Sequence, residues 1–255
     1  MSDPSAPSPA AADETRSRAY YDEFSKGYEK RRGDKIRKGY HDLLDHLEAS
    51  FVERYGKGKE VLEVGCGTGL VLQRIAQFAS RAQGIDLSPG MLEKAKERGL
   101  DVVEGSATRL PFPDNSFDVT CSFKVLAHIP EIDLALSEMA RVTRPGGTIL
   151  AEFYNPKSLR GLLRKMGPAR KIGTTRNEAD VFTRFDSPKE CRELTPADCH
   201  FDGARGVRII TPFARLVDTP LIGSCVYGLE NFLADSPLKE FAGFYIARYT
   251  KHQRP

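Results

Sequence analysis

The sequence predicts an α/β fold in which a mostly parallel sheet is covered by helices on both faces. From Glu60 to Phe153, short apolar runs of strand length alternate with amphipathic runs of helix length, which is typical of parallel strands joined by crossover helices. The chain has 255 residues, of which 40% are hydrophobic, so it is long enough for one large domain with added segments. We therefore expect one domain with a seven-stranded sheet and helical additions at both ends.

Two segments precede the alternating region. Residues 1–14 are rich in Ser, Pro and Ala and have no apolar core, so we expect a disordered tail that is neither a signal peptide nor an anchor. Residues 15–56 are predicted to be helical, with a break near Gly33, because aromatic residues recur there at roughly helical spacing. These residues are Tyr20, Tyr21, Phe24 and Tyr28.

Residues 57–153 are predicted to form the core of the domain. Five strands are expected, at Glu60–Val64, Gln83–Leu87, Val102–Glu104, Phe117–Phe123 and Thr148–Phe153. Helices are expected at Thr68–Phe78, after the capping residue Ser88, and at Ile132–Val142, with a turn at Arg144–Gly147.

The rest of the chain is less regular. Two more strands are expected, at Ala204–Thr211 and Phe241–Tyr249. The insertions at 154–200 and 212–238 are predicted to form a cap, whose apolar content suits either ordinary packing or an apolar ligand pocket. Ser158–Met166 reads as a basic amphipathic helix, which suits a solvated face, an anionic ligand or a membrane surface.

A glycine-rich segment follows the first strand, with the sequence Val61-Leu-Glu-Val-Gly-Cys-Gly-Thr-Gly69. Glycines at a junction of strand and helix allow a sharp turn and a close approach of a ligand to the backbone. The segment lacks the Gly-Lys-Ser/Thr ending of a P-loop, and the sixth position counted from Gly65 is Leu70 rather than the glycine of a dinucleotide fingerprint. The spacing favours a cofactor without a pyrophosphate and with an amino-acid tail.

Asp86 ends the second strand, in Gly84-Ile-Asp-Leu-Ser-Pro-Gly-Met91. A carboxylate at this position can accept hydrogen bonds from both hydroxyls of a ribose. Capping of the next helix is the other role open to it, but Ser88 already fills that role. We therefore interpret Asp86 as a ribose ligand.

These segments resemble the successive motifs of class I S-adenosylmethionine-dependent methyltransferases, in the branch that contains ubiquinone/menaquinone C-methyltransferases and natural-product methyltransferases. The resemblance covers about Tyr20 to Phe153. It implies a Rossmann-like fold, a lid formed by the N-terminal helices, and S-adenosylmethionine as the cofactor. The motifs are Val61–Gly69, Gly84–Leu92, Gly105–Phe112, Asp114–Asp118 and Arg144–Gly147.

The resemblance also implies roles for individual residues. Glu63, Gly65 and Gly67 would surround the methionine portion, and Asp86 would bind the ribose. The adenine would be bordered by Leu87, Met91, Ser106 and Ala107, although the family commonly has Asp where Ser106 stands. The other candidate cofactor residues are Tyr28, Cys66, Gly69 and Phe123.

Methyl transfer from a sulfonium is an in-line displacement, so positioning supplies much of the acceleration and a base is needed only if the acceptor must lose a proton. His128 follows a strand end and is a candidate base, a substrate contact or a structural residue. Tyr20 is a second catalytic candidate, on the lid. No Cys or His spacing predicts a metal site.

The predicted function is methylation of a small molecule, which could be a natural product. The alternatives are a lipid or isoprenoid-quinone methyltransferase and a non-catalytic protein that binds S-adenosylmethionine. A net charge of +3, from 38 basic and 35 acidic residues, argues against nucleic acid as a partner. With no apolar run of membrane-spanning length, the sequence predicts a cytoplasmic protein, for which peripheral membrane contact stays open. The sequence does not specify an oligomeric state.

Overall fold

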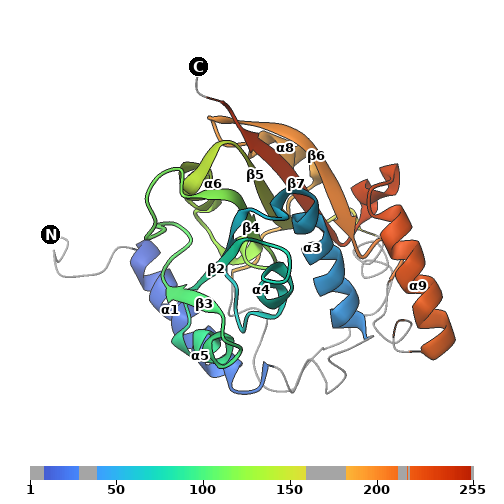
Figure 1. Cartoon of the computed structure of the whole chain (residues 1–255), viewed down its shortest axis with the longest axis horizontal. Coiled ribbons are helices and arrows are strands. Elements are labelled where there is room, and N and C mark those ends of the chain that lie inside the picture. The colour runs from blue at the N-terminus through green and yellow to red at the C-terminus, as the bar shows by residue number, and fades with distance from the viewer. Residues whose placement is uncertain (1–8, 29–38, 159–181, 212–216, 218, 254–255) are drawn as a thin grey trace, which may run out of the picture.

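Within the described residues, seven strands form one sheet at the centre of the molecule (Figure 1). The computed structural model describes residues 9–28, 39–158, 182–211, 217 and 219–253. The strands are β1 (Glu60–Val64), β2 (Arg81–Asp86), β3 (Asp101–Glu104), β4 (Phe117–Ser122), β5 (Thr143–Tyr154), β6 (Cys199–Val207) and β7 (Phe244–Lys251). Their order is β3-β2-β1-β4-β5-β7-β6, and only β7 runs antiparallel to its neighbours. The predicted fold class is confirmed.

Helices cover both faces of the sheet. Helices α3 (Tyr40–Gly56), α4 (Leu70–Ile75) and α5 (Pro89–Glu97) pack on one face through apolar side chains. Helix α6 (Ile132–Val142) and the short α8 (Pro188–Glu193) pack on the other. Both layers bury β1 and β4, so nearly all residues of these two strands are buried, including polar ones such as Glu63, Thr120 and Ser122.

Helix α1 (Pro9–Ser25) lies alongside α5 at the β3 edge of the molecule (Figure 1). It begins within the segment 1–14 that was predicted to be a disordered tail, so that prediction is wrong for residues 9–14. Proline is favoured at the first position of a helix, and the three alanines that follow are strong helix formers. Residues 1–8 and the predicted break at Gly33 lie outside the described residues.

The turn predicted at Arg144–Gly147 is instead part of β5, which begins at Thr143. A register shift between Phe117 and Val119 on β4 allows the pairing to continue past these glycines. Gly147 is needed there, because an added Cβ would lie 2.7 Å from the carbonyl oxygen of Asp118.

The second half of the chain also differs in its boundaries. Strand β6 begins at Cys199 and ends at Val207, whereas the predicted strand was Ala204–Thr211. The limits of β6 follow from its pairing with β7, in which Cys199 lies opposite Lys251 and Val207 opposite Phe244. In the predicted cap segments, the structure shows α8, α9 (Pro220–Leu233) and the 3-10 turn η4 (Pro237–Phe241). The predicted basic helix Ser158–Met166 falls almost entirely outside the described residues.

Helix α9 lies beside α3 (Figure 1), where the rings of Tyr227 and His46 are 5.1 Å apart. An ion pair between Arg54 and Asp235, with nitrogen and oxygen 2.6 Å apart, joins the same two regions. None of the helices in the described part of the chain combines the length and apolar character that crossing a membrane requires.

Candidate cofactor and acceptor site

The sheet reverses its strand order between β1 and β4. The chain proceeds from β1 to β2 and β3 in one direction, then returns to β4 and β5 on the other side. In open α/β sheets, ligands bind beyond the carboxyl ends of the strands at such a switch point. The glycine-rich segment, which we call the glycine loop (residues 65–69), leaves β1 at this point.

The three glycines of the loop all have positive φ angles, of 76° at Gly65, 54° at Gly67 and 81° at Gly69. A Cβ added at Gly65 would lie 2.3 Å from Val125 Cγ2, and one at Gly69 would lie 2.3 Å from Leu100 Cδ1. A Cβ at Gly67 would meet no atom within 4 Å. Gly65 and Gly69 are therefore needed for packing within the protein, whereas Gly67 borders open space that a ligand can enter.

The side chain of Cys66 points into the protein. It is 6% exposed and packs on Gly84, where an added Cβ would lie 2.6 Å from the Cys66 sulfur. Only the backbone of Cys66 is therefore available to a ligand.

Asp86 lies at the end of β2 and supports the loop. Its carboxylate accepts hydrogen bonds from the backbone N–H groups of Gly67, at 2.8 Å, and Ser88, at 2.9 Å. Burial raises the pKa of Asp86, although these hydrogen bonds lower it in part. Each carboxylate oxygen can accept further hydrogen bonds, so the group can hold the loop and contact a ligand together.

Of the residues predicted to border the adenine, Leu87 and Met91 follow this carboxylate in the chain, and Ser106 and Ala107 follow β3. Ser88 caps α5 as predicted, because its hydroxyl accepts a hydrogen bond from the Met91 N–H group at 3.2 Å. Met91 is 5% exposed, and Leu87 is half-buried. After β3, the Ser106 hydroxyl lies 2.9 Å from that of Thr108, and Ala107 is half-buried against the core.

Helix α1 closes over the start of α5. The Asp22 carboxylate accepts hydrogen bonds from the Ser88 hydroxyl, at 2.6 Å, and from the Gly90 N–H group, at 3.0 Å. Arg18 forms an ion pair with Glu104 at 2.5 Å. These contacts connect the N-terminal helix to the elements that follow β2 and β3.

Tyr21 is the α1 side chain that faces the switch point. Its ring centroid is 6.5 Å from that of His128, and burial, with smaller effects of Tyr20 and Asp86, raises its pKa. Tyr20 stacks on Phe24 instead, at 5.8 Å, so its predicted catalytic role stays a prediction. Tyr28 contacts Phe24, with ring centroids 5.4 Å apart.

His128 ends the 3-10 turn η1 (Leu126–His128), just beyond β4. Its Nδ1 atom lies 3.0 Å from the carbonyl oxygen of Phe182, an arrangement in which Nδ1 carries the proton and donates it. Nε2 is then the basic nitrogen, and the Tyr154 hydroxyl is 3.5 Å from it. Burial lowers the pKa of His128, which favours the neutral imidazole.

A group of buried charged residues lies beside the ends of β1, β4 and β5, under α3. We call it the acidic core, and it consists of Asp45, Glu48, Glu63 and Glu152 together with Lys124. Lys124 has a positive φ of 61°, an uncommon conformation for a residue other than glycine. Its Nζ atom is 2.7 Å from Glu48 Oε1 and 3.4 Å from Asp45 Oδ1, and its N–H group donates to Glu152 Oε1 at 3.0 Å.

Of the four acids of this group, sequence reasoning identified only Glu63. A signal was present, because Glu152 interrupts the apolar run of β5, and Asp45 and Glu48 lie among the leucines of the buried face of α3. Phe123, predicted to contact the cofactor, is 4% exposed and packs in the apolar core beneath α3.

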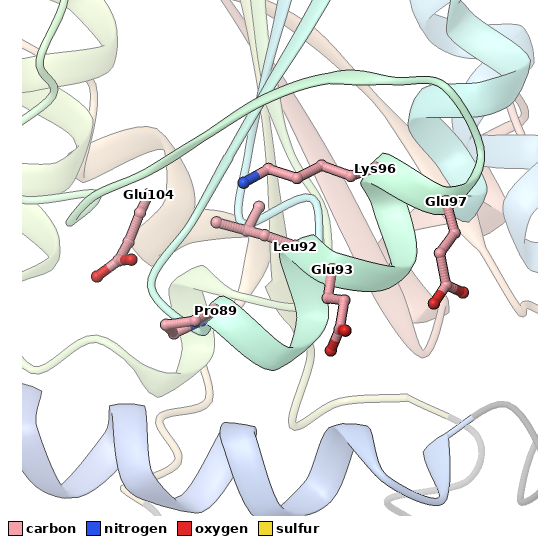
Figure 2. A pocket seen from close by; sticks show the side chains of 6 residues that line it. All are labelled: Pro89, Leu92, Glu93, Lys96, Glu97 and Glu104. Carbon is pink, nitrogen blue, oxygen red and sulfur yellow. The ribbon is translucent and has the colours of Figure 1, made fainter.

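Two further features lie outside this arrangement. A surface pocket of about 360 Å³ lies between α5 and the end of β3 (Figure 2). It is lined by Pro89, Leu92, Glu93, Lys96, Glu97 and Glu104, none of which is a predicted cofactor residue. Within the described ranges, no group of His, Cys, Asp and Glu side chains is arranged to hold a metal ion.

Three observations fit a cofactor that joins an adenosine to an amino acid. The loop has open space at Gly67, and a carboxylate stands at the end of β2. Glu63 is 3% exposed, and its Oε2 atom has no hydrogen-bond partner among the described residues. A buried oxygen without a partner is costly unless a ligand or water satisfies it.

Comparisons with known proteins agree with this fit. Residues 62–151 match the family described as a methyltransferase domain. A demethylmenaquinone methyltransferase of Mycobacterium marinum is 44% identical over 107 residues, which are 41% of this chain and 46% of that protein. The chain thus spans about half the length of the curated relatives it matches.

Solved structures share the fold across most of the chain. A S-adenosylmethionine-dependent methyltransferase of Thermotoga maritima has a TM-score of 0.59 at 20% identity, covering 89% of this chain and 97% of that one. The [4+2]-cyclase SpnF has a TM-score of 0.55 at 22% identity, covering 82% and 81%. Because these identities are low, the likeness concerns the fold and not the reaction.

The family match includes most of β1, the glycine loop, Asp86 and β4, whereas the helices α1 and α3 lie outside it. The predicted resemblance is confirmed by this match and by the curated relatives. Residues 62–151 therefore match the methyltransferase domain family, and the chain resembles the class I, S-adenosylmethionine-dependent methyltransferases of the quinone-methylating branch.

Proposed function

We propose that this chain is an enzyme that transfers the methyl group of S-adenosylmethionine to a small-molecule acceptor. The observation that carries the proposal is the pairing of Asp86 with the glycine loop, because the carboxylate holds the Gly67 N–H group beside the open space of the loop. The same segment matches the methyltransferase domain family.

Each predicted cofactor residue has a place in this proposal. Asp86 accepts from the ribose, and Glu63 lies by the methionine end. The backbone of the glycine loop borders the ligand, while Cys66 and Phe123 contribute through their main chain because their side chains are buried elsewhere. The remaining contacts are assigned to Tyr28, Leu87, Met91, Ser106 and Ala107.

S-adenosylmethionine, when bound, supplies a methyl group on a positively charged sulfur, which an acceptor atom attacks in line. We assign His128 as the base that takes the acceptor's proton, because its Nδ1 is held by the Phe182 carbonyl and its Nε2 is left basic. Tyr154 lies beside Nε2, and Tyr21 packs against the same imidazole ring. Tyr154 and Tyr21 therefore flank the imidazole ring that carries the proton-accepting nitrogen.

The test is a comparison of His128→Asn with His252→Asn, which removes an exposed histidine. We expect His128→Asn to lower kcat about a hundredfold, as loss of a positioned base does, without changing cofactor affinity. S-adenosylhomocysteine release would be measured with reduced short-chain demethylmenaquinone and with 2-naphthol as acceptors, and cofactor binding by calorimetry. Equal kcat values for the two variants would exclude the assignment.

The pH dependence provides a second readout. The histidine acts as a base only when neutral, and burial lowers its pKa below the ordinary value of 6.5. Activity should therefore persist below pH 6.5 and fall as the pH approaches the lowered pKa. Loss of activity already above pH 6.5 would contradict the role of His128.

A lipid quinone is the second candidate acceptor, and the enzyme would then work from the cytoplasm at a membrane surface. The exposed apolar side chains Ile222, Leu229 and Phe232 on α9, the last 79% exposed, favour it. Co-sedimentation with phosphatidylcholine/phosphatidylglycerol vesicles should then occur and be reduced by Phe232→Ser, but not by Leu134→Ser on α6. A soluble-metabolite enzyme would stay in the supernatant.

A further inference from the structure

The acidic core is buried beside the ends of β1, β4 and β5, on the β4 side of the switch point. Asp86 and β2 take the adenosine end under the proposed function, so the other end of the cofactor runs across β1 toward β4. Glu63 is the next-to-last residue of β1, and Lys124 lies two residues beyond the end of β4. The exposed fractions of the four acids are small: 0% for Glu48, 1% for Glu152, 3% for Glu63 and 4% for Asp45.

Counted over the described residues, the core holds four acids and one base. The Lys124 ammonium lies between Glu48 and Asp45, and so it is shared by the two acids of α3. The Glu63 Oε2 atom has no hydrogen-bond partner among the described residues and is less than a tenth exposed. Among the described side chains, Lys124 is the one cation that the contacts place within the group.

Burial raises the pKa of Glu63 well above its ordinary range, and the neighbouring Glu48 raises it further. Burial and Glu48 act on Glu152 in the same way, although Lys124 opposes them in part. In the ligand-free protein, these two groups therefore favour their protonated forms. A cation placed beside them would favour the ionised forms, because opposite charges attract strongly where water is excluded.

We propose that the acidic core is a charge-selective subsite, which binds a ligand carrying a positive centre beyond the ends of β1 and β4 and thereby holds the sulfonium cofactor in preference to its neutral thioether product. The inference rests on the proposed function. It adds a role for Asp45, Glu48 and Glu152, which lie outside the glycine loop. The neutral S-adenosylhomocysteine that remains after methyl transfer would be bound less tightly and would be released.

A structural role is the competing explanation. The ion pairs of Lys124 join α3 to the end of β4, and such pairs could serve only to hold the helix on the sheet. That explanation predicts an effect of substitutions on folding, but none on the preference for charged over neutral ligands.

Three ligands separate these explanations. Sinefungin carries an amine in place of the methylated sulfur, S-adenosylmethionine carries a sulfonium, and S-adenosylhomocysteine is neutral at that position. All three share the adenosine and amino-acid ends. The ratio of the S-adenosylhomocysteine Kd to the sinefungin Kd, measured by calorimetry, therefore reports on charge at one point of the ligand.

The variants are Glu152→Gln and Glu63→Gln, with Glu93→Gln as the matched control on the exposed side of α5. We expect each core variant to lower the Kd ratio about fivefold or more, since it removes one carboxylate that can ionise beside the cation. The control should keep the wild-type ratio. If one core variant fails to fold, the other core variant and the wild-type measurements described next still test the proposal.

Proton release from the wild-type protein is the measurement that needs no variant. Sinefungin should release more protons than S-adenosylhomocysteine, as seen from binding enthalpies in buffers of different ionisation heat. The preference for sinefungin should grow as the pH rises, because Glu63 and Glu152 then ionise more readily. Besides the members of the core itself, the titratable groups near Glu63 and Glu152 are Asp86, Cys66, Cys121 and Tyr154, and Tyr28 lies near Lys124.

The outcomes distinguish this inference from the proposed function. If none of the three ligands binds, the proposed function fails. If all three bind with a Kd ratio that is unchanged in both core variants, or with equal proton release, the charge-selective subsite is excluded and the proposed function stands.

Discussion

The two sides of the switch point are built in different ways. On the β1–β2 side, backbone N–H groups, glycines and one carboxylate form the site, and all of them lie between Glu63 and Ser88. On the β4–β5 side, side chains from α1, α3, η1 and β5 meet, and they are drawn from Tyr21 to Tyr154. One side is a local feature of the chain, and the other is made by the tertiary fold.

This difference between the two sides corresponds to a difference between general and specific ligand binding. A backbone loop accepts any ligand that carries the right cofactor end, whereas side chains that converge from distant segments discriminate between acceptors. The cyclase SpnF shares the fold, which shows that a common framework is used for different reactions. Under the proposed function, we therefore expect the choice of acceptor to depend on the β4–β5 side.

The largest effect is expected from closing the open space of the loop. Gly67→Val should weaken cofactor binding at least about a hundredfold, because the branched side chain would occupy the space beside the backbone that the ligand needs. The positive φ of 54° adds strain of about 1–2 kcal/mol to the folded state. Calorimetry with S-adenosylhomocysteine and thermal unfolding would measure the two effects separately.

Gly58→Val is the matched control for this experiment. Gly58 has a φ of 69°, lies in the exposed turn before β1, and an added Cβ there would also meet no atom within 4 Å. Its valine variant should lose similar stability and keep full affinity. If the two variants bind the cofactor equally well, the glycine loop is not where the cofactor lies.

The elements of the β1–β2 side were located from the sequence because their determinants are local. Asp86 ends a strand and Ser88 caps the next helix, as predicted. The support that Asp86 gives to the glycine loop was not predicted, and its contact with a ribose stays a prediction. The inner strands β1 and β4 were also located, although β4 carries Asp118, Thr120 and Ser122 among its apolar residues.

The β4–β5 side could not be derived in this way. Tyr20 and Tyr21 are neighbours on α1, and only the docking of the helix through Asp22 decides that Tyr21 faces His128. Glu48, Lys124 and Glu152 are 28 or more residues apart along the chain, and nothing in the local pattern shows that they converge. The edge strand β6 was misplaced because its limits depend on its pairing with β7 rather than on an apolar run.

Helix α1 contacts both sides of the switch point. Weakening its attachment is expected to have the smallest effect of the substitutions considered. Asp22→Ala removes an acceptor of two hydrogen bonds, from the buried Ser88 hydroxyl and the Gly90 N–H group, and should cost about 1 kcal/mol. Because α1 packs over the site without being part of the sheet, this cost should appear as local opening rather than as global unfolding.

Faster hydrogen exchange in α1, with unchanged exchange in β1 and β4, would show this opening directly. Arg18→Gln is the control on the same helix, since its ion pair with Glu104 is nearly half exposed on both partners and is worth between 0 and about 1 kcal/mol. A helix held mainly by Asp22 should respond to the first substitution and hardly to the second.

Tyr21 lies near Asp86 on one side and His128 on the other, so the opening should weaken cofactor binding a few fold and lower kcat as well. A change in only one of these quantities would mean that α1 serves only one side of the switch point.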